Sequence, residues 1–237
     1  ETNTFGANRL RLKFYGLDNK VGEINLAAVN NAKEVRPKNK FIAGSIGPLG
    51  ELLEPLGNIS EDFAYDIFGE QAKILEEAGV DIIYIETMMA IEEVAIAMKA
   101  AKENASLPVA GSMTFELGKS GLKTPWGVDV QTAVNELTNA GADIIGSNCG
   151  KGFDEMIQVI REMKMLTTKP ILAQSNAGIP ELIDGKLFYK ETPEMIAPKV
   201  QELLKSGVNI IGGCCGTNPS HIKKMREVLD LFLNYSI

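Results

Sequence analysis

Three cysteine side chains are the clearest candidates for reactive or metal-binding groups in this sequence. Cys214 and Cys215 are adjacent in a glycine-rich run that follows an apolar stretch, and Cys149 closes another apolar stretch. Disulfide pairing of three thiols would leave one over, whereas one thiophilic cation can hold all of them. Zn²⁺ suits such a set because it is redox-inert and tetrahedral, and three protein ligands leave one position for a substrate. The sequence therefore predicts an open zinc site with Cys149, Cys214 and Cys215 as ligands.

The adjacent pair sets a geometric condition. Neighbouring residues of a regular strand point to opposite faces, so both thiols reach one ion only if the backbone leaves its pleat. Gly212, Gly213 and Gly216 flank the pair and supply that freedom. Two other interpretations stay open. In the first, Cys149 taken alone is a buried apolar residue of the core. In the second, the glycine-rich ends of the last two strands form a phosphate site, as in many barrels.

Composition narrows the class of protein. The 237 residues include 24 basic and 31 acidic side chains, so the net charge is 24 − 31 = −7, which disfavours a nucleic-acid partner. No apolar run approaches the ~18 residues that span a bilayer, and the first residues do not show the basic n-region and apolar h-region of a signal peptide. We expect a soluble, cytoplasmic protein whose thiols stay reduced. No linker or shift in charge marks a boundary, so we expect a single domain over residues 1–237.

Short apolar runs alternate with longer amphipathic ones along the chain. The apolar runs predict parallel strands covered on both faces, at 41–46, 82–85, 108–113, 143–147, 170–174 and 209–212. The amphipathic runs predict helices at 60–77, 91–102, 130–139, 153–165, 193–205 and 219–232. The sole histidine, His221, falls in the first turn of the last helix, where we expect a surface or capping role.

A weak internal repeat supports this organisation. The segments 79–83, 141–145 and 207–211 are near copies of one unit, Gly-x-Asp/Asn-Ile-Ile, in which the glycine ends a helix and a strand follows. Repeated β-α units predict either a closed barrel or an open sheet. No Gly-x-Gly-x-x-Gly follows the first strand, so a dinucleotide-binding sheet has little support. The predicted fold is an α/β (β/α)8 TIM barrel.

The strand count falls one short of that barrel. Counting Asn3-Thr4-Phe5 as the end of a strand gives seven strand positions where a barrel needs eight. The chain also begins at Glu1 rather than at a methionine. We therefore expect that the first strand and helix of the native domain lie upstream of Glu1. An open barrel of seven strands would leave unpaired backbone edges.

Polar and reactive residues gather where the predicted strands end. Glu86, Asn148 with Cys149, Asn176, and the cysteine pair each follow a different strand. In a TIM barrel the C-terminal strand ends form the active site, so we expect these residues at one mouth.

At these residues the chain resembles the zinc-dependent homocysteine S-methyltransferase family. The hallmark is the Gly-Gly-Cys-Cys-Gly segment at 212–216 together with Asn148-Cys149. The likeness extends through segments 2–7, 46–48, 85–87, 113–115 and 176–178. Within the family, segments 45–48, 50–52 and 54–57 are most similar to the homocysteine-binding module of cobalamin-dependent methionine synthase.

The resemblance implies roles for individual residues. Zinc would be held by the three cysteines, and Asn176 would fill the fourth position when substrate is absent. Glu86 would pair with the substrate ammonium group, and Asn148 would lie near the sulfur. The zinc-bound thiolate of homocysteine would then be methylated to methionine, as a step of methionine biosynthesis.

Members of this family use different methyl donors. The resemblance favours methylcobalamin carried by a separate corrinoid protein or domain, while other relatives use betaine or S-methylmethionine. Another small thiol as acceptor, and a non-catalytic barrel that binds a phosphorylated ligand, are the remaining alternatives.

Overall fold

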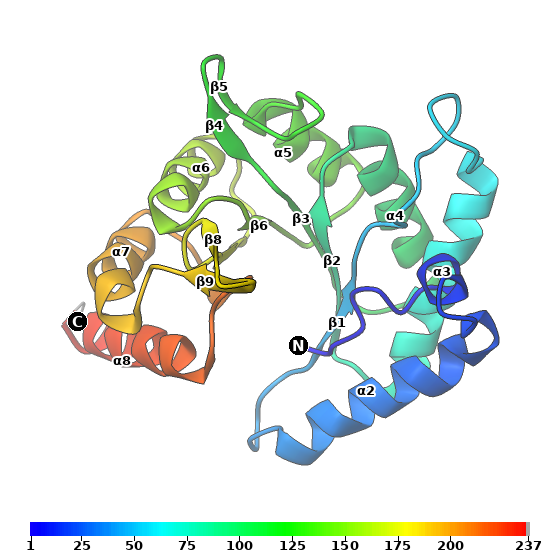
Figure 1. The fold of residues 1–237 in the computed structure, drawn as a ribbon, viewed down its shortest axis with the longest axis horizontal. Helices are drawn as coiled ribbons and strands as arrows, with labels where there is room; N and C mark the ends of the chain where they lie inside the picture. Colours follow the sequence, from blue (N-terminus) through cyan, green and yellow to red (C-terminus); the bar gives the residue numbers. More distant parts are fainter. Residues whose placement is uncertain (236–237) are drawn as a thin grey trace. The chain divides into compact units, whose positions relative to one another are not determined.

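The computed structural model describes residues 1–235, and its contacts divide the chain into two compact units. The first unit comprises residues 1–112 and 135–143, and the second comprises residues 113–134 and the chain from 144 onward. Strands alternate with helices in both (Figure 1), which confirms the predicted α/β class. The closed eight-stranded barrel and the single domain over 1–237 remain predictions. Among the helices of residues 1–235, none combines the length and the apolar character of a membrane span.

The first unit contains three neighbouring strands, β1 (Ala43–Ile46), β2 (Ile82–Met88) and β3 (Val109–Met113), with β1 and β2 parallel. Its long helices are α2 (Val21–Val35), α3 (Glu61–Ala78) and α4 (Ile91–Asn104), and α1 (Arg9–Lys13) is a short one. Helix α3 begins as predicted, because the Ser60 side chain accepts a hydrogen bond from the backbone N–H of Phe63. Buried Phe68 and Leu75 line the inner face of α3, so this helix covers its sheet with an apolar stripe.

The second unit contains a parallel sheet in the order β6 (Ile144–Cys149), β7 (Ile171–Ser175) and β10 (Ile210–Gly213). It also contains the helices α6 (Phe153–Leu166), α7 (Pro193–Lys205) and α8 (Pro219–Tyr235). Helix α5 (Val130–Asn139) is divided between the two units. Two hairpins were not expected from the sequence, β4 (Glu116–Gly118) with β5 (Gly121–Lys123), and β8 (Pro180–Ile183) with β9 (Lys186–Tyr189).

The repeated Gly-x-Asp/Asn unit has the same structural role in each copy. The glycine of each copy has a positive φ, which suits it to end a helix: Gly79 (86°), Gly141 (82°) and Gly207 (87°). The Asp or Asn that follows makes a reciprocal pair with a residue at the start of a neighbouring strand. Its backbone N–H donates to that residue's carbonyl and its side-chain oxygen accepts that residue's N–H, in the pairs Asp81 with Ile42, Asp143 with Val109 and Asn209 with Ile171. Within each unit, the pair at Asp81 fixes the parallel register of β1 with β2 (Ile82–Met88), and the pair at Asn209 fixes that of β7 with β10.

The N-terminal segment differs from the prediction. Asn3-Thr4-Phe5 is not the end of a strand, because residues 1–8 adopt no strand structure. The segment still lies along β1, since Thr2 N–H donates to Ala43 O at 2.9 Å. At Ser45 the hydroxyl groups of Thr2 and Thr4 replace backbone partners, which interrupts the regular ladder. The count of seven strands therefore included one segment that does not form a strand.

Replacing Asp81 by alanine tests whether its reciprocal pair with Ile42 stabilises the fold. Ile42 is 2% exposed, so its N–H would lose an acceptor that water does not readily replace. We expect Asp81→Ala to lower the free energy of unfolding by roughly 1–3 kcal/mol in urea titrations. Asp81→Asn keeps the acceptor, as Asn209 does in the third copy, and removes only a surface ion pair with Arg36, so we expect about 0–1 kcal/mol. Equal losses in the two variants would contradict the assignment.

Candidate metal centre

The three cysteines meet in the second unit. The register of the sheet pairs Cys149 at the end of β6 with Ser175 at the end of β7, and pairs Ser175 with Gly213 at the end of β10. The cysteine pair follows Gly213 directly, so all three thiols reach one edge of the sheet. Their Sγ atoms lie within 4.8 Å of one another. The convergence expected from the sequence is therefore present in the geometry.

Both adjacent cysteines face the cluster because the strand ends before them. Cys214 N–H still donates to Ser175 O at 2.9 Å, whereas the chain then turns, with Thr217 N–H and Oγ1 both donating to Cys214 O. Gly216 has φ +80°, and a Cβ there would lie 2.2 Å from the Tyr189 ring. The turn therefore requires glycine at this position for two reasons, the backbone conformation and the close approach of an aromatic ring.

Cys149 is held in an uncommon conformation. Its φ is +68°, in the left-handed region that residues other than glycine seldom occupy. Such a conformation costs on the order of 1 kcal/mol or more and persists only where surrounding contacts fix it. The result is that the Cys149 thiol turns toward the pair.

Asn176 joins the two cysteine segments. Its side-chain nitrogen donates to Gly150 O at 2.6 Å and approaches Cys149 Sγ at 3.5 Å, while its Oδ1 accepts the N–H of Cys215 at 3.0 Å. Because Gly150 O only accepts and Cys215 N–H only donates, these bonds fix the orientation of the amide. The oxygen proposed as a fourth metal ligand thus already holds the Cys215 backbone. Its ligand role stays a prediction.

Asn148 lies beneath the cluster. Its side chain is fully buried, and its amide nitrogen lies 3.9 Å from Cys214 Sγ, within hydrogen-bonding range of sulfur. Its carbonyl accepts a hydrogen bond from the Thr114 hydroxyl at 3.0 Å. Amide N–H groups aimed at two of the sulfurs, from Asn148 and Asn176, would stabilise those sulfurs as thiolates.

The thiols perturb one another electrostatically. Hydrogen bonding by Cys214 is the main reason that the pKa of Cys149 falls to about 6. The same contact, followed by burial, raises the pKa of Cys214, and burial is the first cause that raises the pKa of Cys215. Without a cation the cluster thus favours a single thiolate, at Cys149. A divalent ion would remove the penalty for ionising the other two.

The donor set fits zinc. Zinc bonds thiolate sulfur at about 2.3 Å, so two sulfurs on a tetrahedral ion are separated by roughly 3.8 Å. The three Sγ atoms here lie within 4.8 Å of one another, so only a small contraction of the cluster would bring them to that separation. Thiolates also select zinc over hard cations such as Mg²⁺ and Ca²⁺.

Glu86 belongs to the first unit. It lies in β2, is 6% exposed, and accepts a hydrogen bond from the Ser45 hydroxyl. Thr87, the next residue, has φ +60°, which is unusual for a β-branched side chain. A buried carboxylate beside a strained residue is typical of a binding site, and its role in binding substrate stays a prediction.

Three residues near the cluster were missed or misjudged from the sequence. Tyr189 packs against Gly216, and its pKa is raised by burial and then by the negative charge of the cysteines. His221 caps a helix as expected but is 5% exposed, so the surface role is wrong. Glu191 was not predicted to lie near the site. The Asp184-Gly185 turn between two apolar runs was the available signal for the β8–β9 hairpin that precedes Glu191.

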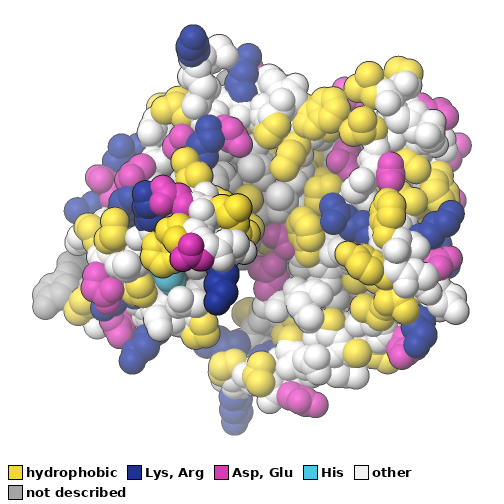
Figure 2. Space-filling view, in the orientation of Figure 1, with side chains coloured by type: hydrophobic (Ala, Val, Ile, Leu, Met, Phe, Trp, Pro, Cys, Tyr) yellow, Lys and Arg dark blue, Asp and Glu magenta, His cyan; other side chains and the backbone are white. Residues whose placement is uncertain are grey.

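The hairpin presents an apolar surface. Hydrophobic side chains gather over β8 and β9 in Figure 2, and Leu182, Leu187 and Phe188 are all more than half exposed. Tyr189 lies at the end of this hairpin, so the hairpin borders the cysteine loop.

The chain is similar to a known family and to several solved structures. A family model described as homocysteine S-methyltransferase matches residues 1–229. The oxidized form of the homocysteine methyltransferase MmuM from Escherichia coli has a TM-score of 0.76 at 20% identity, over 95% of this chain and 77% of that one. Its metallated form has a TM-score of 0.74 at 18% identity, with the same coverage. A methyltransferase from Methanosarcina mazei has a TM-score of 0.60 at 14% identity, over 90% and 65% of the two chains. At these identities the structural matches show a shared fold.

Proposed function

We propose that this chain, which belongs to the homocysteine S-methyltransferase family, holds zinc through Cys149, Cys214 and Cys215 and methylates homocysteine to methionine. The observation that supports this most directly is the convergence of three thiols within 4.8 Å at adjacent strand ends. Three protein ligands leave one tetrahedral position for the substrate sulfur. Family membership supports a thiol as the methyl acceptor.

The chemistry needs a deprotonated sulfur. A free thiol has a pKa near 8.5 and is mostly protonated at neutral pH, and bound zinc would lower that pKa. The sulfur then forms a bond to the methyl carbon as the bond between methyl and donor breaks, and the thiol proton leaves to solvent. Three cysteine thiolates would bring three negative charges to a divalent ion, so the site keeps electron density on sulfur. The side-chain N–H groups of Asn148 and Asn176, directed at Cys214 Sγ and Cys149 Sγ, would stabilise two of these thiolates.

Glu86 is proposed to recognise the substrate ammonium group. It is buried, it accepts a hydrogen bond from Ser45, and a carboxylate gains most from pairing with a cation where water is excluded. The strand-end position also matches the glutamate that the family resemblance assigns to substrate binding.

The donor is proposed to be a methyl-corrinoid protein or domain. Support comes from the segments at 45–48, 50–52 and 54–57, which are similar to the corresponding module of cobalamin-dependent methionine synthase. Methyl transfer with methylcobalamin, betaine and S-methylmethionine, assayed side by side, distinguishes the three donors. Metal analysis with and without homocysteine distinguishes this function from the phosphate-binding alternative, which predicts no bond between zinc and the added thiol.

Replacing Cys214 by alanine tests the metal role. The variant retains only two thiols, so we expect zinc content, measured by elemental analysis, and methyl transfer to homocysteine to be lost together. Ser220→Ala is the matched control, since it removes one exposed side-chain oxygen from the same segment and no ligand. Full activity of Cys214→Ala in the verified absence of zinc would contradict the proposal.

Changes at Glu86 separate substrate binding from structure. We expect Glu86→Ala and Glu86→Gln to raise the KM for homocysteine on the order of tenfold or more, because each removes the charge that pairs with the ammonium group. Zinc content should stay near that of the wild type. Ser45→Ala is the control, since it removes the hydrogen bond to Glu86 and leaves the carboxylate. If zinc content and homocysteine affinity fall equally, Glu86 is structural.

A further inference from the structure

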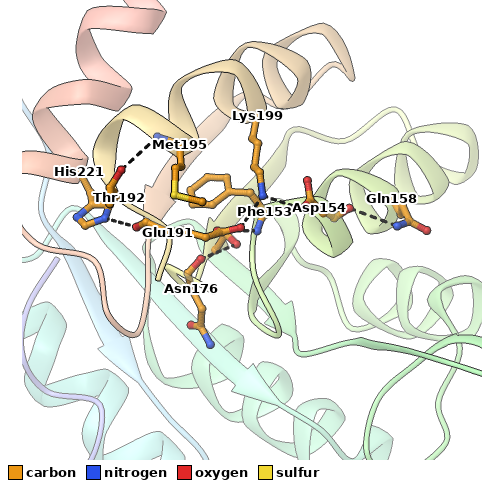
Figure 3. Close-up of polar contacts among 10 residues, drawn as sticks. Phe153, Asp154, Gln158, Asn176, Glu191, Thr192, Met195, Lys199 and His221 are labelled. Atoms are coloured by element: carbon orange, nitrogen blue, oxygen red, sulfur yellow. Dashed lines mark hydrogen bonds and ion pairs between the residues drawn. The ribbon is translucent and has the colours of Figure 1, made fainter. Parts of the chain in front are cut away.

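One residue outside the cluster touches all three loops that carry it. Glu191 follows strand β9 and precedes α7, and its side chain is only 12% exposed. Figure 3 shows it between the first turn of α6, the Asn176 loop and His221 of α8. The first turn of α6 lies a few residues after Cys149, and His221 lies a few residues after Cys215. The third contact is in the loop that contains Asn176 itself.

The loop after β6 rests on the Glu191 carboxylate. Oε2 accepts the backbone N–H of Phe153 at 3.4 Å, where helix α6 begins. A Cβ at Gly152 would lie 3.3 Å from the same oxygen, so the loop backbone packs closely against the side chain. Gly152 has φ +126°, a conformation that glycine adopts readily. The chain between Cys149 and α6 is thereby fixed at its far end.

The loop after β7 is hydrogen-bonded to the Glu191 backbone and packs against the aliphatic part of its side chain. Glu191 N–H donates to Ala177 O at 3.1 Å, next to Asn176. A Cβ at Gly178 would lie 3.2 Å from Glu191 Cγ. Glycine at 178 therefore lets this loop approach Glu191, as glycine at 152 does for the first loop.

The loop after β10 is held through His221. Its Nε2 donates to Glu191 O at 2.8 Å, because a carbonyl only accepts. Its Nδ1 contacts Asn218, with the backbone N at 3.3 Å and Oδ1 at 3.0 Å, while Asn218 Oδ1 accepts the N–H groups of Ser220 and His221. This reciprocal capping ties the start of α8 to Glu191. His221 is 5% exposed, so the imidazole serves as a buried connector.

Lys199 holds the Glu191 carboxylate in place. Its Nζ contacts Glu191 Oε1 at 2.5 Å and Asp154 at 2.6 Å, and Asp154 lies in α6. Burial alone would lower the pKa of Lys199, but its hydrogen bonds to Asp154 and Glu191 more than offset this and raise it. The carboxylate is thus paired where its desolvation would otherwise be costly.

We propose that Glu191 and His221 are positioning residues that set the distances among Cys149, Asn176 and the cysteine pair, and through them the affinity of the site for zinc. The proposal rests on the proposed zinc function. Outer contacts that orient metal ligands change metal affinity by about 10- to 100-fold when they are removed. A residue that only stabilised the fold would lower stability and leave the affinity of the folded protein unchanged.

The test measures zinc affinity of folded protein by competition with a chromophoric chelator. We expect Glu191→Ala to weaken zinc binding on the order of tenfold or more, and Glu191→Gln to weaken it less because it keeps the acceptor for Phe153. Glu202→Gln is the matched control, since Glu202 forms an exposed ion pair with Arg161 that also joins α7 to α6 but touches none of the loops. It should bind zinc as the wild type does.

His221 provides the second pair of variants. His221→Gln keeps an N–H donor for Glu191 O, whereas His221→Phe removes it, so we expect the phenylalanine variant to lose more affinity. Visible absorption of the Co²⁺-loaded protein gives an independent readout, because it reports whether the thiolate site stays tetrahedral. We expect an altered spectrum in Glu191→Ala and His221→Phe only.

The outcomes separate the two proposals. Wild-type zinc affinity and an unchanged Co²⁺ spectrum in folded Glu191→Ala and His221→Phe would overturn the positioning role and leave the zinc function standing. Equal weakening in Glu202→Gln would also overturn it, since the effect would then be one of helix packing. Failure of the wild-type protein to bind zinc would overturn both.

Discussion

The parallel register of β6, β7 and β10 is the constraint on which the cysteine cluster depends. Pairing of Cys149 with Ser175, and of Ser175 with Gly213, places the ends of three strands level with one another. A shift of one residue in β10 would move the cysteine pair by about 3.3 Å and reverse which faces its side chains take. The Asn209–Ile171 pair fixes this register at the opposite ends of the strands. Chemistry at one edge of the sheet is thus specified partly by a polar pair at the other.

Much of this arrangement was accessible from the sequence because it is local or repetitive. Helix α3 starts at its Ser60 cap, and each Gly-x-Asp/Asn unit ends a helix and starts a strand as predicted. The convergence of the cysteines followed from the rule that parallel strands end at one edge. The need for the chain to leave the sheet at Cys214 followed from the alternation of side chains along a strand.

Other features were inaccessible because they arise from contacts distant in sequence. Glu191 gains its role from loops at 152, 177 and 221, and no local pattern marks it among other charged residues. The left-handed conformation of Cys149 contradicts the ordinary preference of its residue type. Thr2 and Thr4 pair with Ser45 through hydroxyl groups, so an apparent strand end became an irregular segment.

The three cysteines are proposed to hold zinc and to leave one coordination position for the sulfur of the substrate. X-ray absorption at the zinc edge of the purified protein, with and without homocysteine, measures this directly. The sequence contains only three cysteines, so a fourth thiolate sulfur must come from outside the chain. We predict three sulfur neighbours and one nitrogen or oxygen before homocysteine is added, and four sulfur neighbours afterwards. A zinc environment that homocysteine does not change would contradict the proposal that the substrate sulfur binds zinc.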